Sequence, residues 1–320
     1  ILIRNFLPLP DTVAYGVGFA VQYALRAGII LLGFRLSLTE AVKLGVWGVP
    51  LIVACISAGL FVALFITSRS NQSRRLGTLI AAGTGICGVT AIMATAPVIK
   101  AKENEISYAV ANITIFGLLG MLAYPYLANF FFAEDAVKAG LFLGTAIHDT
   151  AQVTGAALIH AQIYDMDRVI DVATITKLTR NLFIIAVIPF ISYMYFQSKE
   201  KNGEGAAGQL PKWTKLFPLF IVGFLFLSLA RTVGDATAVS TGSAFGLWNP
   251  ASWQSFHQFW SSIGSTYMLG IAMAGVGLST NFKAFKGMGI RPFYIGLIAA
   301  LSVGAVSLLL ISLFGHLVVI

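Results

Sequence analysis

The sequence contains very few charged residues. Asp, Glu, Lys and Arg together make up 11% of its 320 residues, against about 25% in an ordinary soluble domain. Hydrophobic residues make up 57%, and the mean hydropathy is +0.83. So few charges could not cover the surface of a soluble globule. The composition therefore excludes a soluble enzyme, a disordered chain and a nucleic-acid-binding domain.

Cysteine and catalytic motifs are also scarce. The two cysteines, Cys55 and Cys87, both lie in apolar runs, so they cannot form a disulfide framework. The sequence shows no nucleotide-binding motif, no HExxH pattern and no pair of intramembrane aspartates. We therefore expect neither an enzyme nor a bound cofactor or metal, and no ATP-driven pump within this chain. The chain starts at Ile1 with no Met, so we expect a trimmed or incomplete N-terminus.

Long apolar stretches dominate the sequence, and a bilayer-spanning helix needs about 20 such residues. We predict an all-α fold, a polytopic transmembrane helix bundle with the lipid bilayer as its partner. The predicted spans are 12–34, 44–66, 76–99, 106–131, 138–161, 170–196, 213–231, 253–280 and 292–318. Residues 197–212 are expected to form a cytoplasmic loop between a first half, 1–196, and a second half, 213–320. Residues 232–252 could be a loop or a short re-entrant helix.

Lys and Arg in the connecting segments predict the orientation. With nine crossings, six of these residues fall on one side and twelve on the other. The richer side is assigned to the cytoplasm, which places the C-terminus outside. Most of the net charge of +8 is therefore an orientation signal.

A shift of 242 positions reveals an internal repeat. The aligned residues are Gly28 with Gly270, Gly33 with Gly275, Leu36-Ser37 with Leu278-Ser279, Gly45 with Gly287, and Pro50 with Pro292. Seven predicted helices separate the copies, and an odd number inverts the second copy relative to the first. Inverted repeats are typical of secondary transporters. We expect one or two helices of the first copy upstream of Ile1.

Two spans carry sequences that weaken a helix. The first contains Gly83, Gly85 and Gly88, each about 1 kcal/mol less favourable in a helix than Ala. The second, 144–155, opens with the same Gly-Thr-x-Ile pattern and crowds polar side chains around His148 and Asp149. Both are predicted to be discontinuous helices lining a cavity. Close helix packing is the alternative for the glycines of the first.

A third polar patch, 174–181, places Lys177 and Arg180 on one helix face. They either line the site or lie at the membrane interface. An excess of intramembrane positive charge and broken helix ends favours a small anion. The predicted substrate-binding residues are Gly83, Thr84, Gly85, Cys87, Gly88, Thr90, Thr150, Gln152, Lys177 and Arg180. His148 and Asp149 are predicted to couple transport to H+ or Na+, and Arg26 is a candidate structural ion-pair partner.

Four stretches resemble the YeiH-type family of bacterial inner-membrane proteins, which is associated with sulfate export. They read RAGIILLGFRLSLTE (26–40), AAGTGICGVTAIMATAPVIKA (81–101), GTAIHDTAQVTGAA (144–157) and GIAMAGVGLSTNFK (270–283). The most specific elements are GICG (85–88) and HDTAQV (148–153), where Asp149 stands in place of the expected Glu. The resemblance implies about eleven helices, two of them upstream of Ile1. It also implies an elevator-type core and scaffold, related to bile acid and arsenite transporters.

The resemblance thus implies a multi-pass secondary active transporter of the bacterial inner membrane, working by alternating access on sulfate, sulfite or a similar anion. A passive anion channel is one alternative. A Na+-coupled transporter of an organic anion or bicarbonate is another. The inverted repeat and the titratable His148–Asp149 pair favour coupled transport. The sequence allows a homo-oligomer but decides neither the oligomeric state, the anion, the direction nor the coupling ion.

Overall fold

The computed structural model describes residues 6, 10–35, 38–70, 72–200, 219–279 and 290–318. In these ranges the chain is helical and has no strand beyond an isolated bridge between Ala244 and Trp248. The all-α prediction is therefore confirmed. Exposed apolar side chains such as Phe61 and Phe130 lie on its long helices, as expected for surfaces that face lipid.

Among the described residues, four helices are long and apolar enough to cross a membrane. They cover Val42–Arg69, Asn104–Phe132, Val222–Thr241 and Pro292–Leu317. The pair Arg168–Leu182 and Ile184–Gln197 passes the same test together and is bent by 44° at Phe183, so it is either a broken span or a re-entrant loop. Long, apolar helices and bent pairs therefore account for fewer crossings than the nine predicted. The orientation derived from nine crossings stays a prediction.

The predicted spans 12–34 and 253–280 are continuously helical in their described residues, whereas three others are interrupted. Residues 76–99 are divided at 86–88, residues 138–161 at 147–149, and residues 170–196 at Phe183. The first break is shorter than its glycine run, because Gly83 and Gly85 still belong to the preceding helix. The predicted loop 197–212 begins in helix, since helix α11 (Ile184–Glu200) continues to Glu200, and the rest lies outside the described residues.

The predicted end of the seventh span at residue 231 is wrong. Helix α13 (Leu219–Thr241) continues through the small-residue segment, so 232–241 is neither a loop nor a separate re-entrant helix. The hydroxyls of Thr232, Thr237 and Thr241 donate to carbonyls four residues back, which satisfies these polar groups within the helix. A tight turn then leads into α14 (Pro250–Ser262), capped by Asn249.

The chain forms two compact units that each draw on both ends of the sequence. Unit 1 comprises residues 1–47, 218–281 and 319–320, and unit 2 comprises 48–217 and 282–318. These units differ from the predicted division into 1–196 and 213–320. Helix α4 (Leu38–Arg69) contributes its first ten residues to unit 1 and the remainder to unit 2.

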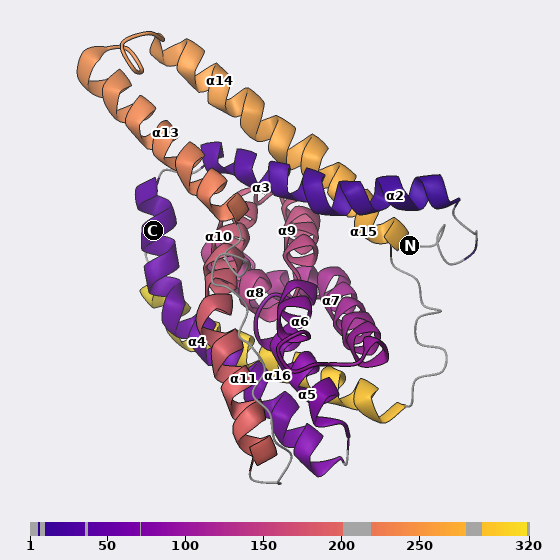
Figure 1. Cartoon of the computed structure of the whole chain (residues 1–320). Helices are drawn as coiled ribbons and strands as arrows, with labels where there is room; N and C mark the ends of the chain where they lie inside the picture. The colour runs from indigo at the N-terminus through magenta and orange to yellow at the C-terminus, as the bar shows by residue number, and fades with distance from the viewer. Residues whose placement is uncertain are drawn as a thin grey trace. The chain divides into compact units, whose positions relative to one another are not determined.

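Unit 1 contains two helical rods and the α13–α14 hairpin, whose arms lie side by side in Figure 1. The first rod is α2 (Asp11–Phe19), η1 (Ala20–Ala24), α3 (Leu25–Leu32) and η2 (Gly33–Arg35). The second is α14, η3 (Ile263–Met268) and α15 (Leu269–Ser279). The rods touch at Gly28 and Gly264: a Cβ on Gly264 would lie 3.0 Å from the Gly28 carbonyl oxygen. Only glycine allows this backbone approach.

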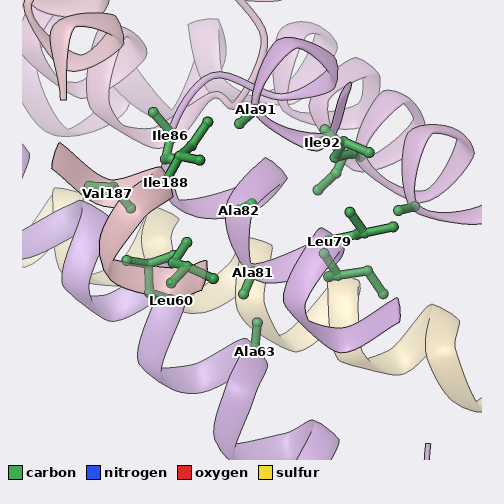
Figure 2. Close-up of a cluster of buried hydrophobic side chains, with 14 of the residues drawn as sticks. Leu60, Ala63, Leu79, Ala81, Ala82, Ile86, Ala91, Ile92, Val187 and Ile188 are labelled. Atoms are coloured by element: carbon green, nitrogen blue, oxygen red, sulfur yellow. The ribbon is translucent and has the colours of Figure 1, made fainter. Parts of the chain in front are cut away.

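Unit 2 surrounds both breaks of interest. It contains α5 (Arg74–Gly85), α6 (Val89–Thr95), α7 (Glu103–Phe132), α8 (Ala136–Ala146), α9 (Thr150–Tyr164), α10 (Arg168–Leu182), α11, α16 (Ile290–Phe314) and η5 (Gly315–Leu317). A hydrophobic cluster joins α4, α5, α6 and α11 (Figure 2). Ile86, in the first break, is fully buried in this cluster. The break is therefore covered on one side by packed side chains and not by lipid.

The predicted repeat at a shift of 242 stays a prediction, and two short helical segments agree with it. Shifting the π-helical segment η1 gives residues 262–266, which overlap the π-helical segment η3. Pro50 lies in α4 and Pro292 in α16, so each copy supplies one rod to unit 1 and one long helix to unit 2. The aligned positions 36–37 and 287 lie outside the described residues.

Candidate functional site

The two helix breaks of unit 2 are equivalent at a shift of 61 residues. Gly85 ends α5 and Ala146 ends α8, and these positions differ by 61. Val89 starts α6 and Thr150 starts α9, again 61 apart. The shared Gly-Thr-x-Ile pattern therefore marks the same structural feature twice: the last turn of a helix followed by a three-residue break. Each break begins with a buried isoleucine, Ile86 or Ile147.

Arg180 of α10 joins the ends of α5 and α8. Its Nη2 donates to the carbonyls of Thr84 (2.7 Å) and Gly85 (3.0 Å), and its Nε to Gly85 (3.2 Å). Its Nη1 donates to the carbonyls of Thr145 (2.6 Å) and Ile147 (3.3 Å). A guanidinium has five N–H donors, so these five contacts use all of them.

Lys177 lies one turn earlier on α10 and bridges the same two breaks. Its Nζ donates to the carbonyls of Ile86 (3.3 Å) and Ile147 (3.0 Å), and it makes a short contact to the carbonyl of His148. An ammonium has three donors, so all three are used. Both side chains are completely buried, at 0% exposure. Neither side chain therefore lies on the surface of the protein, and the interfacial alternative for their depth in the membrane stays a prediction.

These contacts assign the two cations to helix C-termini. The last carbonyls of a helix have no partner within it and form the negative end of its dipole. Here α5 and α8 both end inside the protein, where water cannot satisfy those carbonyls. Lys177 and Arg180 supply the missing donors and the opposite charge. The prediction that these two side chains bind the substrate directly does not fit this geometry, because neither has a free N–H.

Asp149 caps the helix that follows the second break. Its Oδ1 accepts from the backbone N–H of Ala151 at 2.9 Å, in the first turn of α9. Gly88 of the first break lies against it, with a φ of +68°: a Cβ there would be 3.1 Å from Asp149 Oδ2. The two breaks therefore approach each other at Gly88 and Asp149.

Two amide side chains tie α9 to its neighbours. Gln152 Nε2 donates to the Thr114 carbonyl of α7 at 2.9 Å. Asn181 Nδ2, on α10, donates to the hydroxyl of Thr150 at 3.1 Å. Both bonds fix the start of α9, next to the Asp149 cap. Gln152 is thus partly engaged in holding helices together.

Several buried polar atoms around the breaks have no hydrogen-bond partner among the described residues. They are Thr84 Oγ1, His148 Nδ1, Gln152 Oε1, Thr176 Oγ1 and Asn181 Oδ1. An unpaired buried polar group costs about 1–3 kcal/mol, so such a set marks a place where a ligand or water would be stabilising. The side of the breaks at Thr90 is exposed, and Asp149 and Thr150 are half-buried.

The structure brings together all but one of the predicted site residues. Those of the first break lie in the last turn of α5, in the break itself or at the start of α6; those of the second lie in the break or at the start of α9. Cys87 is buried in the first break. Arg26 lies on α3 of unit 1, exposed and without an ion-pair partner among the described residues. In the ranges the structure describes, no group of three His, Cys, Asp or Glu side chains could hold a metal ion.

The predicted site residues leave out three contributors to this cluster: Thr145, Asn181 and the carbonyls of residues 84–86. Thr145 and Asn181 lie within the polar stretches 144–155 and 174–181. A signal for the Asp149 cap was present, because Asp followed three residues later by Gln is typical of a helix start. Backbone carbonyls leave no trace in side-chain chemistry. Asn181 sits 31 residues from Thr150, so only tertiary structure pairs them.

Comparison with known proteins identifies relatives along the whole chain. The model of the family described as conserved hypothetical protein 698 matches residues 1–296. A UPF0324 membrane protein of Streptococcus agalactiae serotype V is 31% identical over 315 residues, which cover 98% of this chain and 88% of the relative. A UPF0324 membrane protein of Fusobacterium nucleatum is 32% identical over 305 residues, covering 94% and 84%. No solved structure matches the chain.

Proposed function

The chain belongs to the conserved hypothetical protein 698 family, whose relatives are named UPF0324 membrane proteins, and we propose that it is a secondary active transporter of a small anion in the bacterial inner membrane. The observation that carries the proposal is the pair of equivalent helix breaks inside unit 2. Interrupted helices with unsatisfied polar groups at membrane depth are the usual substrate and ion sites of secondary transporters. A purely structural protein would not require interrupted helices with unsatisfied polar groups.

The charge of the cluster supports an anionic substrate. Lys177 and Arg180 contribute two positive charges, and Asp149 contributes one negative charge. The two cations donate only to carbonyls. Their excess positive charge nevertheless makes the electrostatic potential around the breaks more positive, because the interior has a low dielectric constant. The substrate itself would be held by the hydroxyls of Thr84 and Thr90 and by backbone N–H groups at the start of α9. Sulfate and sulfite, which the sequence resemblance implies, suit such donors.

Asp149 provides a route to coupling. As a carboxylate it occupies the N–H of Ala151, a donor that an incoming anion would also seek. Protonation of Asp149 would weaken its hold on that N–H and remove a negative charge beside the site. Binding of a proton and binding of the anion would then favour each other. Coupling to Na+ at the same breaks is the other form of the proposal.

The repeat supports alternating access. Each copy at the shift of 242 supplies a rod to unit 1 and a long helix to unit 2. An inverted repeat of this kind would give the two access states related geometry. In the elevator form that the resemblance implies, the unit that holds the breaks would carry the anion while the other serves as scaffold.

Uphill flux tests the proposal. Purified protein in proteoliposomes should accumulate labelled sulfate or sulfite against its gradient when a H+ or Na+ gradient is imposed. The Asp149→Asn variant should keep the α9 cap, because Asn caps about as well as Asp, but should lose gradient-driven uptake. Flux that only ever runs downhill would instead support the passive channel. Accumulation of bicarbonate or an organosulfonate in place of sulfate would support the second alternative substrate class.

A further inference from the structure

The carbonyl groups around the Lys177 ammonium form a distinctive arrangement. The oxygens of Ile86, Ile147 and His148 converge on Nζ from two different helix breaks. All three belong to unwound backbone or a helix C-terminal end. In secondary transporters, carbonyls of that origin coordinate Na+. Hard oxygen ligands without a carboxylate suit a monovalent cation.

The lysine must be charged to fill this cage. Three carbonyl oxygens can only accept, so each requires its own N–H donor. A neutral amine has two donors and would turn its lone pair toward the third carbonyl. The contacts to all three oxygens therefore require the ammonium form in this conformation. With these three contacts made, the side chain places a single positive charge where a free ion would otherwise be held.

We propose that the Lys177 ammonium is a tethered cation occupying a Na+-type carbonyl site formed by Ile86, Ile147 and His148, and that the protein therefore does not use Na+ there. The consequence for coupling rests on the proposed transport function: if Na+ does not bind at this site, H+ is the coupling ion at the breaks. The cage itself is independent of transport. A covalently held cation keeps the two breaks joined in every step of a cycle, whereas a free ion would have to bind and leave.

Charge balance makes the inference testable. Replacing the ammonium by Na+ changes no net charge beside Arg180 and Asp149, the charged groups that lie near Lys177. Lys177→Ala removes the stem as well, leaving room for an ion with water as additional ligands. Alanine also keeps the propensity of α10 to form helix. Lys177→Met removes the charge but retains an apolar chain that fills the space, so it is the matched control.

The experiment measures thermal unfolding of the purified full chain in detergent, in NaCl and in N-methyl-D-glucamine chloride at equal ionic strength. The wild type should unfold at the same temperature in both salts. Lys177→Ala should be less stable than the wild type without Na+ and should gain several degrees as NaCl is raised about 100-fold above its apparent dissociation constant. Lys177→Met should be destabilised and should not respond to Na+.

Each other result has a defined meaning. A folded Lys177→Ala protein without a Na+ response would overturn the inference, as would a wild type that is itself stabilised specifically by Na+. If Lys177→Ala can be purified only in NaCl, that rescue is the expected effect; failure in both salts contradicts the inference. None of these readouts needs a substrate, so failure here is separable from failure of the flux experiment.

Discussion

Single residues at the breaks work chiefly on the backbone. Removing a cation from water is costly, and a buried one persists only where its donors are satisfied. Arg180 and Lys177 meet this condition with carbonyls from both breaks. Each cation therefore cross-links the ends of two helices through their last carbonyls. Their role is to hold the site in shape and to set its potential.

Arg180→Lys tests that role. Lysine offers three donors on one compact ammonium in place of five on a planar fork, so it cannot reach both helix ends as Arg180 does, and each carbonyl left unpaired costs about 1–3 kcal/mol. We expect a loss of several degrees in the thermal unfolding midpoint, with the anion affinity of the folded protein little changed. Arg231→Lys is the control. Arg231 also donates to carbonyls, those of Phe34 and Arg35, but is partly exposed, so water limits the loss. An Arg180→Lys protein of wild-type stability that has lost anion binding would show direct recognition instead.

At the level of elements, the breaks depend on where the backbone can turn. Gly88 combines a left-handed φ of +68° with contact to Asp149. Gly242, in the turn after α13, has a φ of +76°, but a Cβ at this position would meet nothing within 4 Å. The two glycines thus share the conformational requirement and differ in their surroundings.

Gly88→Ala should destabilise the protein more than Gly242→Ala does. Both variants place an alanine at a positive φ, a strained conformation that costs about 1–3 kcal/mol, and only the first also pushes against Asp149. Unfolding midpoints measured side by side give the difference, and transport by Gly88→Ala should fall as well. Equal losses for the two variants would mean that Gly88 and Asp149 do not pack together in the folded protein.

The start of α8 supplies a prediction about pH. Asp135 caps this helix: its Oδ1 accepts from the N–H of Lys138 at 2.9 Å, and its Oδ2 pairs with Lys138 Nζ at 3.0 Å. Partial burial acts to raise the pKa of Asp135, but the Lys138 N–H and ammonium outweigh it and hold the pKa below its ordinary value of 3.8. A lowered folded-state pKa stabilises the protein above the unfolded-state value. That contribution is lost as the pH falls through the folded-state pKa.

Asp135→Ala should therefore cost about 1 kcal/mol of stability at pH 7 through the lost cap. The difference from the wild type should begin to shrink as the pH drops below 3.8 and should disappear as the pH falls through the lower folded-state pKa, where the wild-type carboxylate becomes protonated. Chemical denaturation at a series of pH values measures this. A difference that stays constant from pH 7 to the acid limit would exclude the charged cap as its source.

At the scale of the whole molecule, alternating access and a channel differ in which side reaches the breaks. Thr90 is the exposed residue of the cluster, in the first turn of α6. The native cysteines, Cys55 and Cys87, are both buried and unpaired. They can be replaced by alanine so that a single reporter thiol remains.

A Thr90→Cys protein in that background should react with a membrane-impermeant thiol reagent from either side of the bilayer. Substrate should protect it on one side and expose it on the other, because the two states exchange during transport. Labelling rates in right-side-out and inside-out vesicles provide the measurement. Simultaneous access from both sides, insensitive to substrate and gradient, would favour the channel.

The sequence by itself determined the broad architecture and the location of the cluster. Scarce charge and long apolar runs require helices in lipid, because only helices satisfy the backbone there. Glycines and polar side chains in a span mark breaks, and the repeated Gly-Thr-x-Ile pattern marked them twice. Local chemistry sufficed for these conclusions.

Only the tertiary structure decided what the charged residues contact. From the sequence, Lys177 and Arg180 are predicted to be ligands for an anion, yet they lie against carbonyls 29 to 96 residues away in the chain. Carbonyls are present at every position and become unsatisfied only where a helix ends, so no side-chain pattern reveals them. The fold brings two such helix ends together around Lys177 and Arg180. The two cations therefore donate to backbone carbonyls, and not to a substrate as the sequence predicts.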